Sequence, residues 1–213
     1  MPNMGDYRET YDNFTWDKAK EMLGYKDGDP INIGWFCSDR ICEMGKADKL
    51  ALIWEGFTGA VEKYTFDELR VNTNTYGAFL RSIGVKEGDR VCIFMDKIPD
   101  LYFSFLGILK IGAIAQPLFS AFGEEALHTR MESATSSVIL TTKKHFRKVR
   151  RIKDQLPELR HIVVVDDDTL KFEERESAFI LKKAEKVDKF DICTTGPESP
   201  SVLHYTSGTT GQP

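Results

Sequence analysis

Residues 91–118 read VCIFMDKIPDLYFSFLGILKIGAIAQPL, and this stretch decides the fold class of the chain. It starts with an apolar run, residues 91–95, that is typical of a buried strand. Pro99 suits the first turn of a helix, and the apolar helix that it begins runs to Leu109 and closes at Gly112. Residues 113–118 form a second short strand. A strand, a helix and a strand in this order indicate parallel pairing, because parallel neighbours need a crossover connection.

The same alternation continues on both sides of this stretch. Thr65 and Glu68 form a capping box that opens a helix ending at Gly84. Further helices are predicted at 124–132 and 144–156, and further strands at 50–56, 59–66, 137–142, 161–168 and 202–206, with 59–66 as the hairpin partner of 50–56. We therefore predict an α/β fold with a mostly parallel sheet and helices on both faces.

Three other segments have helical patterns. Residues 16–23 form one helix, and residues 33–44 form another that Asn32 caps and Gly45 ends. Residues 170–189 are charged and helical in pattern, with lysines and glutamates on a solvated face.

The composition excludes several classes of protein. The 213 residues are 41% hydrophobic and 29% charged, as in ordinary globular proteins, and the formal net charge is -4. A dedicated nucleic-acid binder is expected to be strongly basic, so no nucleic-acid partner is predicted. No apolar run approaches the roughly 20 residues needed to span a membrane, and the first residues lack the pattern of a secretory signal.

The cysteines indicate a reducing compartment. Cys37, Cys42, Cys92 and Cys193 are scattered, with no Cys-x-x-Cys pair and no histidine at a metal-ligand spacing. We interpret them as buried, reduced thiols, which predicts a cytoplasmic protein and no metal site in the chain.

The last residues, YTSGTTGQP at 205–213, contain the strongest functional signal. Gly208 and Gly211 let the backbone turn so that successive N–H groups face one anion. The hydroxyls of Thr206, Ser207, Thr209 and Thr210 add donors for phosphate oxygens. The pattern of the Walker loop is absent from the chain, and a surface linker rich in Ser, Thr and Gly is the alternative interpretation.

With this loop in place, the chain resembles the AMP-forming acyl-CoA synthetases of the adenylate-forming superfamily. Their signature is similar to YTSGTTGxPKG, and residues 205–213 match all but its last two positions. Six further blocks occur in the order seen in the acetyl-CoA synthetase-like branch: NIGWFCSDR, LALIWEG, YTFDEL, GVKEGDRVCIFM, LGILKIGAIAQPLFSAFGEEAL and SVILTT.

The resemblance implies a two-step reaction. A carboxylate attacks the α-phosphorus of ATP and releases pyrophosphate, and the thiol of coenzyme A then displaces AMP from the acyl-adenylate. The positions that match the phosphate loop are Thr206, Ser207, Gly208, Thr209, Thr210 and Gly211, and Mg²⁺ would share their task. The branch implies a short or medium acid and a place in fatty acid metabolism.

The resemblance also implies a coenzyme A site. Phe119, Ser120 and Ala121 match a loop of the form FGGF, although Ser and Ala replace its two glycines. Arg147 and Arg150 match two arginines that contact the 3′-phosphate of coenzyme A in relatives, and their spacing places them on one side of a helix. They belong to a run, residues 143–153, with seven cationic residues in eleven, and a solvated helix face is the alternative interpretation.

The resemblance divides the chain into a helical N-terminal extension, residues 1–48, and the first part of the large N-terminal adenylation domain, residues 49–213. The family's next residues, and the segments for the adenine, the ribose and most of the acid pocket, are expected in a C-terminal part of the same polypeptide. We therefore expect residues 1–213 alone to be inactive. Two alternatives stay open: an adenylation domain with another acceptor, as in peptide synthetases or luciferases, and a nucleotide- or coenzyme-A-binding module without catalysis.

Two other polar features are interpreted as structural. His204 is expected to be a packed strand residue rather than a base. The aspartates at 166–168 follow a strand, and carboxylates there commonly cap a helix or start a turn.

Overall fold

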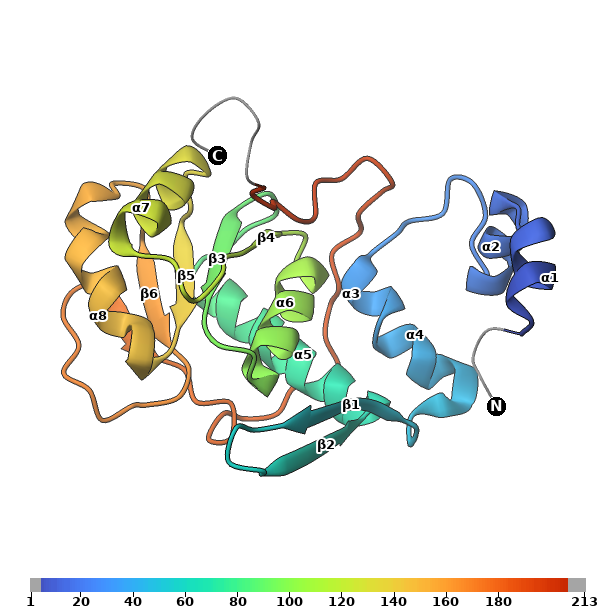
Figure 1. Cartoon of the computed structure of the whole chain (residues 1–213), viewed down its shortest axis with the longest axis horizontal. Coiled ribbons are helices and arrows are strands. Elements are labelled where there is room, and N and C mark those ends of the chain that lie inside the picture. Colours follow the sequence, from blue (N-terminus) through green and yellow to red (C-terminus); the bar gives the residue numbers. More distant parts are fainter. Residues whose placement is uncertain (1–4, 207–213) are drawn as a thin grey trace.

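A five-stranded parallel sheet forms the centre of the computed structural model, which describes residues 5–206 (Figure 1). The strand order is β4-β3-β5-β6-β7, and every neighbouring pair is parallel. The strands are β3 (Arg90–Phe94), β4 (Ile114–Pro117), β5 (Val138–Thr141), β6 (His161–Val164) and β7 (Glu176–Ala178). The predicted α/β class with a parallel sheet is confirmed.

Helices cover both faces of this sheet, because consecutive strand residues are apolar and their side chains point alternately to the two faces. Val91 and Ile93 join the core that contains α5 (Phe66–Ser82) and α6 (Pro99–Lys110). Cys92 and Phe94 join the core on the other face, with α7 (Glu124–Ser133) and α8 (Lys143–Ile152). A 3₁₀ turn, η2 (Lys153–Gln155), extends α8.

A separate hairpin precedes α5 in the chain. Strands β1 (Leu50–Glu55) and β2 (Val61–Thr65) pair antiparallel, as predicted. The capping box at the start of α5 is also confirmed, because Thr65 Oγ1 accepts from the Glu68 N–H and Glu68 Oε2 accepts from the Thr65 N–H. The hairpin therefore leads directly into the helix that covers one face of the sheet.

The N-terminal part of the described chain is helical. It contains α1 (Tyr7–Asp12), α2 (Trp16–Leu23), α3 (Ile33–Phe36), α4 (Asp39–Ile41) and a π-helical turn, η1 (Cys42–Lys46). The predicted helix at 16–23 and the cap by Asn32 are confirmed, since Asn32 Oδ1 accepts from the Trp35 N–H.

The continuous helix predicted for residues 33–44 is wrong. It breaks at Ser38, whose backbone is not helical and whose hydroxyl donates to the Gly34 carbonyl. The break brings Asp39 to Lys110 of α6, at 2.5 Å between Oδ2 and Nζ, so a tertiary ion pair overrides the helical pattern. Gly45, the predicted end, lies inside η1 with φ +74°.

The helix predicted for residues 170–189 is also wrong. This segment contains strand β7, and Arg175 immediately before it has φ +68°, which a helix does not allow. Phe179 stacks on Phe79 of α5 with ring centroids 4.0 Å apart, and Glu176 is buried beside α8. Packing and ion pairing with distant residues therefore determine this segment more than its charge pattern does.

The connections that follow β3 and its two neighbours, β4 and β5, leave the sheet on opposite faces. The chain leaves β3 toward α6 on one face and leaves the adjacent β4 toward α7 on the opposite face. In open α/β sheets, ligands bind at the carboxyl edge where neighbouring strands diverge in this way. The predicted coenzyme A loop, which follows β4, lies at this point.

Candidate functional site

The last described residues reach the same edge. Val202 pairs with Ala115 in a parallel bridge: the Ala115 N–H donates to the Ser201 carbonyl, and the Leu203 N–H donates to the Ala115 carbonyl. The predicted strand at 202–206 is therefore reduced to one bridge beside β4. Because the bridge is parallel, the chain proceeds from it toward the carboxyl edge of the sheet.

Only the first residue of the predicted phosphate loop lies within the described chain. Thr206 is exposed, and Ser207, Gly208, Thr209, Thr210 and Gly211 lie outside the described residues. His204 is exposed rather than packed, so that prediction is wrong. Tyr205 is half-buried and packs against the α7–α8 core, which fixes the start of the loop.

The predicted coenzyme A loop is attached to the first turns of α8. Ser120 lies close enough to Asp96, the second residue beyond β3, to lower the pKa of its carboxyl group. Asp96 also contacts Lys144 Nζ at 2.6 Å and His145 Nε2 at 3.1 Å. The hydrogen bond from Lys144, with the neighbouring Ser120 and His145, holds the pKa of Asp96 well below its ordinary range.

A second contact fixes the other end of this loop. Lys148 Nζ donates to the Phe122 carbonyl at 3.0 Å. Phe119 and Ala121 remain exposed, and the Phe119 ring meets the Phe122 ring edge to face at 5.8 Å. The loop thus presents an aromatic ring and free backbone to solvent next to α8.

The two predicted phosphate-binding arginines differ in their surroundings. Both lie on α8 three residues apart, and Arg147 is exposed with no ion pair among the described residues. Arg150 is held by Glu176, which accepts from its Nε at 3.0 Å and from its Nη2. Its guanidinium also lies 4.5 Å from the centroid of the Phe146 ring.

Glu176 is a buried carboxylate at the start of β7. Besides Arg150, it accepts from Lys153 Nζ at 2.9 Å and from the Glu173 N–H at 2.9 Å. Burial alone raises the pKa of Glu176, but the hydrogen bonds from Arg150, Glu173 and Lys153 outweigh it and lower the pKa from 4.5 to about 2.

Most of the basic run on α8 is paired within the protein. The remaining partners are Asp167 for Lys143, Asp96 for Lys144 and Glu124 for Arg151, with Glu173 and Glu176 for Lys153. Asp166 accepts from the Lys143 N–H at 2.7 Å and so caps α8, as predicted for the aspartate run.

The comparisons with known proteins agree with this architecture. A family model described as AMP-binding enzyme matches residues 40–213. The chain belongs to this family of AMP-binding enzymes.

Two curated relatives are both acetyl-coenzyme A synthetases. The one from Bacillus subtilis (strain 168) is 37% identical over 214 residues, which cover 99% of this chain and 36% of the relative. The one from Magnetococcus marinus is 31% identical over 222 residues, which cover 98% of this chain and 34% of the relative. The chain therefore spans about a third of the length of these relatives.

Two solved structures share the fold. A Brucella canis acyl-CoA synthetase superposes with a TM-score of 0.82 at 23% identity and covers 97% of this chain, which corresponds to 37% of that one. The acetoacetyl-CoA synthetase from Streptomyces lividans also gives 0.82, at 20% identity, with 100% of this chain and 38% of that one covered.

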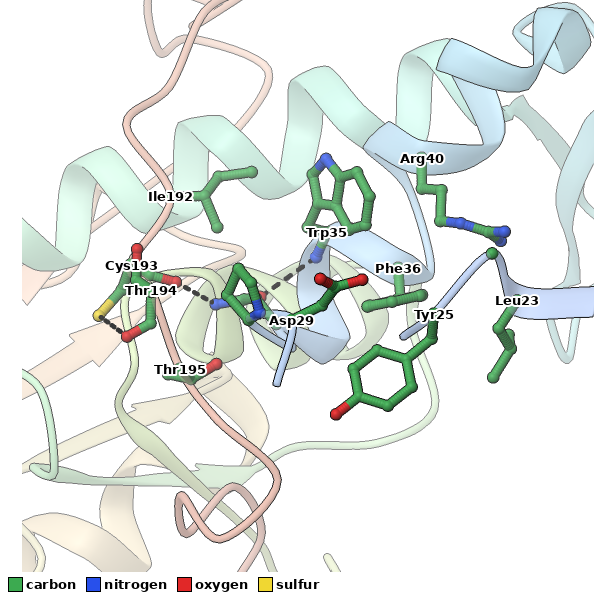
Figure 2. Close-up of a pocket in the computed structure, with 13 residues that line it drawn as sticks. Leu23, Tyr25, Asp29, Trp35, Phe36, Arg40, Ile192, Cys193, Thr194 and Thr195 are labelled. Carbon is green, nitrogen blue, oxygen red and sulfur yellow. Dashed lines mark hydrogen bonds between the residues drawn. The ribbon is translucent and has the colours of Figure 1, made fainter. Parts of the chain in front are cut away.

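A separate pocket of about 320 Å³ lies between the N-terminal helices and the returning segment 192–195 (Figure 2). Tyr25, Trp35, Phe36 and Arg40 line it, and Arg40 lies 5.4 Å from the centroid of the Phe36 ring. Among the described residues, none of those predicted to bind ATP or coenzyme A lines this pocket.

Two further properties concern the described residues as a whole. Within 5–206, no group of three or more His, Cys, Asp or Glu side chains is arranged to hold a metal ion. No helix in this range is long and apolar enough to cross a bilayer. All four cysteines are free, but only Cys92 is buried and Cys37 is exposed, so the prediction of four buried thiols is wrong.

Several residues of the site were missed from the sequence. Their hydrogen bonds and ion pairs join residues far apart in the chain, which a local sequence pattern does not reveal. These residues are Asp96, Lys148, Glu176 and Arg130. The position of Asp96, directly after a buried strand, was the one signal that could have identified it.

Proposed function

We propose that this chain forms the first part of the adenylation domain of an AMP-forming acyl-CoA synthetase, with residues 1–48 as an extension. The enzyme joins a carboxylic acid to AMP with release of pyrophosphate, and then transfers the acyl group to the thiol of coenzyme A with release of AMP. The observation that carries the proposal is the parallel pairing of residues 201–203 with β4, which directs the chain toward the edge where residues 119–123 follow that strand.

The proposed phosphate loop acts in the first step. As pyrophosphate departs, negative charge grows on the β- and γ-phosphates of MgATP, and fixed donors stabilise it more in the transition state than in the substrate. The proposed donors are the backbone N–H groups of the loop and the hydroxyls of its Ser and Thr side chains. The loop residues are Thr206, Ser207, Gly208, Thr209, Thr210 and Gly211. The magnesium ion enters bound to the nucleotide.

The proposed coenzyme A site lies along α8. Phe119, Ser120 and Ala121 line the approach, and Arg147 has its whole guanidinium available for the 3′-phosphate. Arg150 offers less, because Glu176 and the Lys171 carbonyl engage its Nε and Nη2, and Nη1 is the nitrogen left for a ligand.

The acid and the compartment belong to the same proposal. The acetyl-coenzyme A synthetases at 37% and 31% identity support a short acid, within fatty acid metabolism in the wider sense. Four free cysteines support a reducing, cytoplasmic location.

Isotope exchange between ATP and pyrophosphate tests the first step. We expect residues 1–213 alone to give exchange at the level of the blank. In the longer protein that the proposal assumes, joint replacement of Thr206, Ser207, Thr209 and Thr210 by alanine should reduce exchange by about 100-fold or more, since one such donor is commonly worth that much. Exchange within twofold of the unaltered protein would overturn the proposal.

The coenzyme A site is tested separately by Arg147→Glu. We expect this variant to raise the KM for coenzyme A about 10-fold, as for loss of one charge-assisted contact, and to leave ATP–pyrophosphate exchange unchanged. Lys189→Glu, at an exposed position away from α8, is the matched control and should change neither quantity. Loss of exchange in Arg147→Glu would contradict the assignment.

A further inference from the structure

Arg130 of α7 contacts both loops of the proposed site. Its guanidinium carbon lies 4.4 Å from the centroid of the Phe122 ring and 5.9 Å from that of the Tyr205 ring. Phe122 ends the coenzyme A loop, and Tyr205 immediately precedes Thr206 of the phosphate loop. These two loops are about eighty residues apart in the chain, so the Arg130 side chain is a direct link between them.

The surroundings of Arg130 make this link stronger than a surface contact. Arg130 Nη1 donates to the Ala126 carbonyl at 2.9 Å, which orients the guanidinium. Its Nε is buried and has no hydrogen-bond partner among the described residues. Attraction between a cation and an aromatic ring grows when water is excluded from the cation, so the two rings supply the main stabilisation left to this part of the side chain.

The backbone of Arg130 holds the same aromatic residue. Its carbonyl accepts from Tyr205 Oη at 3.1 Å and from Gln116 Nε2 at 3.0 Å. Gln116 is fully buried in β4 and accepts in turn from the Ser136 hydroxyl. The position of Tyr205 is thus set from α7, from β4 and, through the guanidinium, from the coenzyme A loop.

We infer that Arg130 is a positioning residue that couples the coenzyme A loop, residues 119–123, to the start of the phosphate loop at Tyr205 and Thr206. The effect of this coupling on catalysis rests on the proposed function, but the coupling between the two loops does not. Ordering of one loop by its ligand then orders the other through a shared side chain, with no contact between the ligands.

Hydrogen exchange on the 213-residue chain tests the coupling without any nucleotide. Arg130→Met keeps an unbranched apolar side chain of similar reach and removes the cation. We expect amide exchange to accelerate about 10-fold in both 118–123 and 203–206, with β5 and β6 unchanged. Arg130→Lys should restore part of the protection, because an ammonium keeps the charge but not the planar stacking on two rings.

Arg160→Met is the matched control. Arg160 pairs with Asp89 at 2.6 Å at the amino edge of the sheet, so its loss should leave both loops as they are. Phe122→Leu should loosen both loops in the unaltered chain and have no further effect in Arg130→Met. The inference would be overturned if Arg130→Met accelerated amide exchange in only one of the two loops. It would also be overturned if amide exchange accelerated uniformly over the sheet.

Kinetics in the longer protein supply the second readout. We expect Arg130→Met to raise the KM for MgATP and the KM for coenzyme A together, each about fivefold, while Arg160→Met raises neither. A change in one KM alone would count against coupling. If the unaltered protein showed no isotope exchange between ATP and pyrophosphate, the proposed function would fail. The amide hydrogen exchange of the two loops would still decide whether Arg130 couples them.

Discussion

The pair formed by Glu176 and Arg150 shows why a charge pattern does not reveal the role of a single residue. In the sequence, Arg150 is one of seven cations on a basic run, and Glu176 is one acid in a charged segment. In the structure, the Glu176 side chain is fully buried and takes four hydrogen bonds, two of them from Arg150. A buried carboxylate with this many donors is a structural element that also limits how Arg150 can meet a phosphate.

We predict that Glu176→Gln lowers the free energy of unfolding at pH 7 by about 2–3 kcal/mol, because it leaves Arg150 and Lys153 without their shared carboxylate. The pKa of Glu176 is lower in the folded protein than in the unfolded chain. Its stabilisation is therefore complete above about pH 4.5 and is lost as the pH falls toward 2.

Urea unfolding at a series of pH values measures both effects. Glu176→Gln should flatten the loss of stability between pH 5 and pH 2. Glu173→Gln is the control, because Glu173 is mostly exposed and makes one ion pair, with Lys153. The same pH slope in Glu176→Gln as in the unaltered chain would contradict the assignment.

At the scale of elements, the sequence predicted what depends on local pattern. The strand, helix and strand of residues 91–118, the capping box at Thr65 and the hairpin before it all form as expected, because each is encoded within a few residues. The helix predicted at 170–189 failed because its residues are held by partners about a hundred residues away, such as Phe79 for Phe179.

The candidate site divides in the same way. The phosphate loop and the coenzyme A loop could be found from their own residues, and the carboxyl edge at which they lie follows from the parallel strand order. Arg130 and Glu176 could not, because each acts through contacts that exist only after the sheet has formed.

We predict that Lys110→Met detaches the N-terminal helices from α6. The Lys110 side chain is fully buried and is paired with Asp39 of α4 and with Asn74 Oδ1, at 2.5 and 2.6 Å. Burial lowers the pKa of Lys110, and the adjacent Asp39 carboxylate opposes that change. Methionine leaves the Asp39 carboxylate unpaired, so we expect a loss of about 3 kcal/mol.

Hydrogen exchange locates that effect. Amides in 33–46 should exchange faster in Lys110→Met, whereas Lys86→Met, at an exposed position, should leave them unchanged. Adding Asp39→Leu to Lys110→Met should recover most of the lost stability, because an apolar pair can replace a buried ion pair at little cost. No recovery in the double variant would show that the ion pair is not the link.

At the scale of the whole molecule, the described chain has a packed body and a loosely attached beginning. Two apolar cores lie on the two faces of the sheet, and α3 packs closely against α6 through Gly34, where an added Cβ would lie 2.7 Å from the Leu106 carbonyl oxygen. Helices α1 and α2 lie at one end of the molecule (Figure 1). They contain no buried residue, and Tyr7, Tyr11 and Trp16 are largely exposed.

Removal of residues 1–23 should therefore lower the melting temperature by less than about 2 °C, because almost no apolar surface of the remaining chain becomes exposed. Removal of residues 1–36 is the informative comparison. It deletes α3 and also Asn32, whose Nδ2 donates to the carbonyls of Leu109 and Cys193 at 2.9 and 3.0 Å. The two carbonyls would lose this donor, so a fall of about 6 °C or more is expected. Calorimetry on both truncated chains would separate the two helical units, and equal melting temperatures for them would mean that α3 is no better attached than α1 and α2.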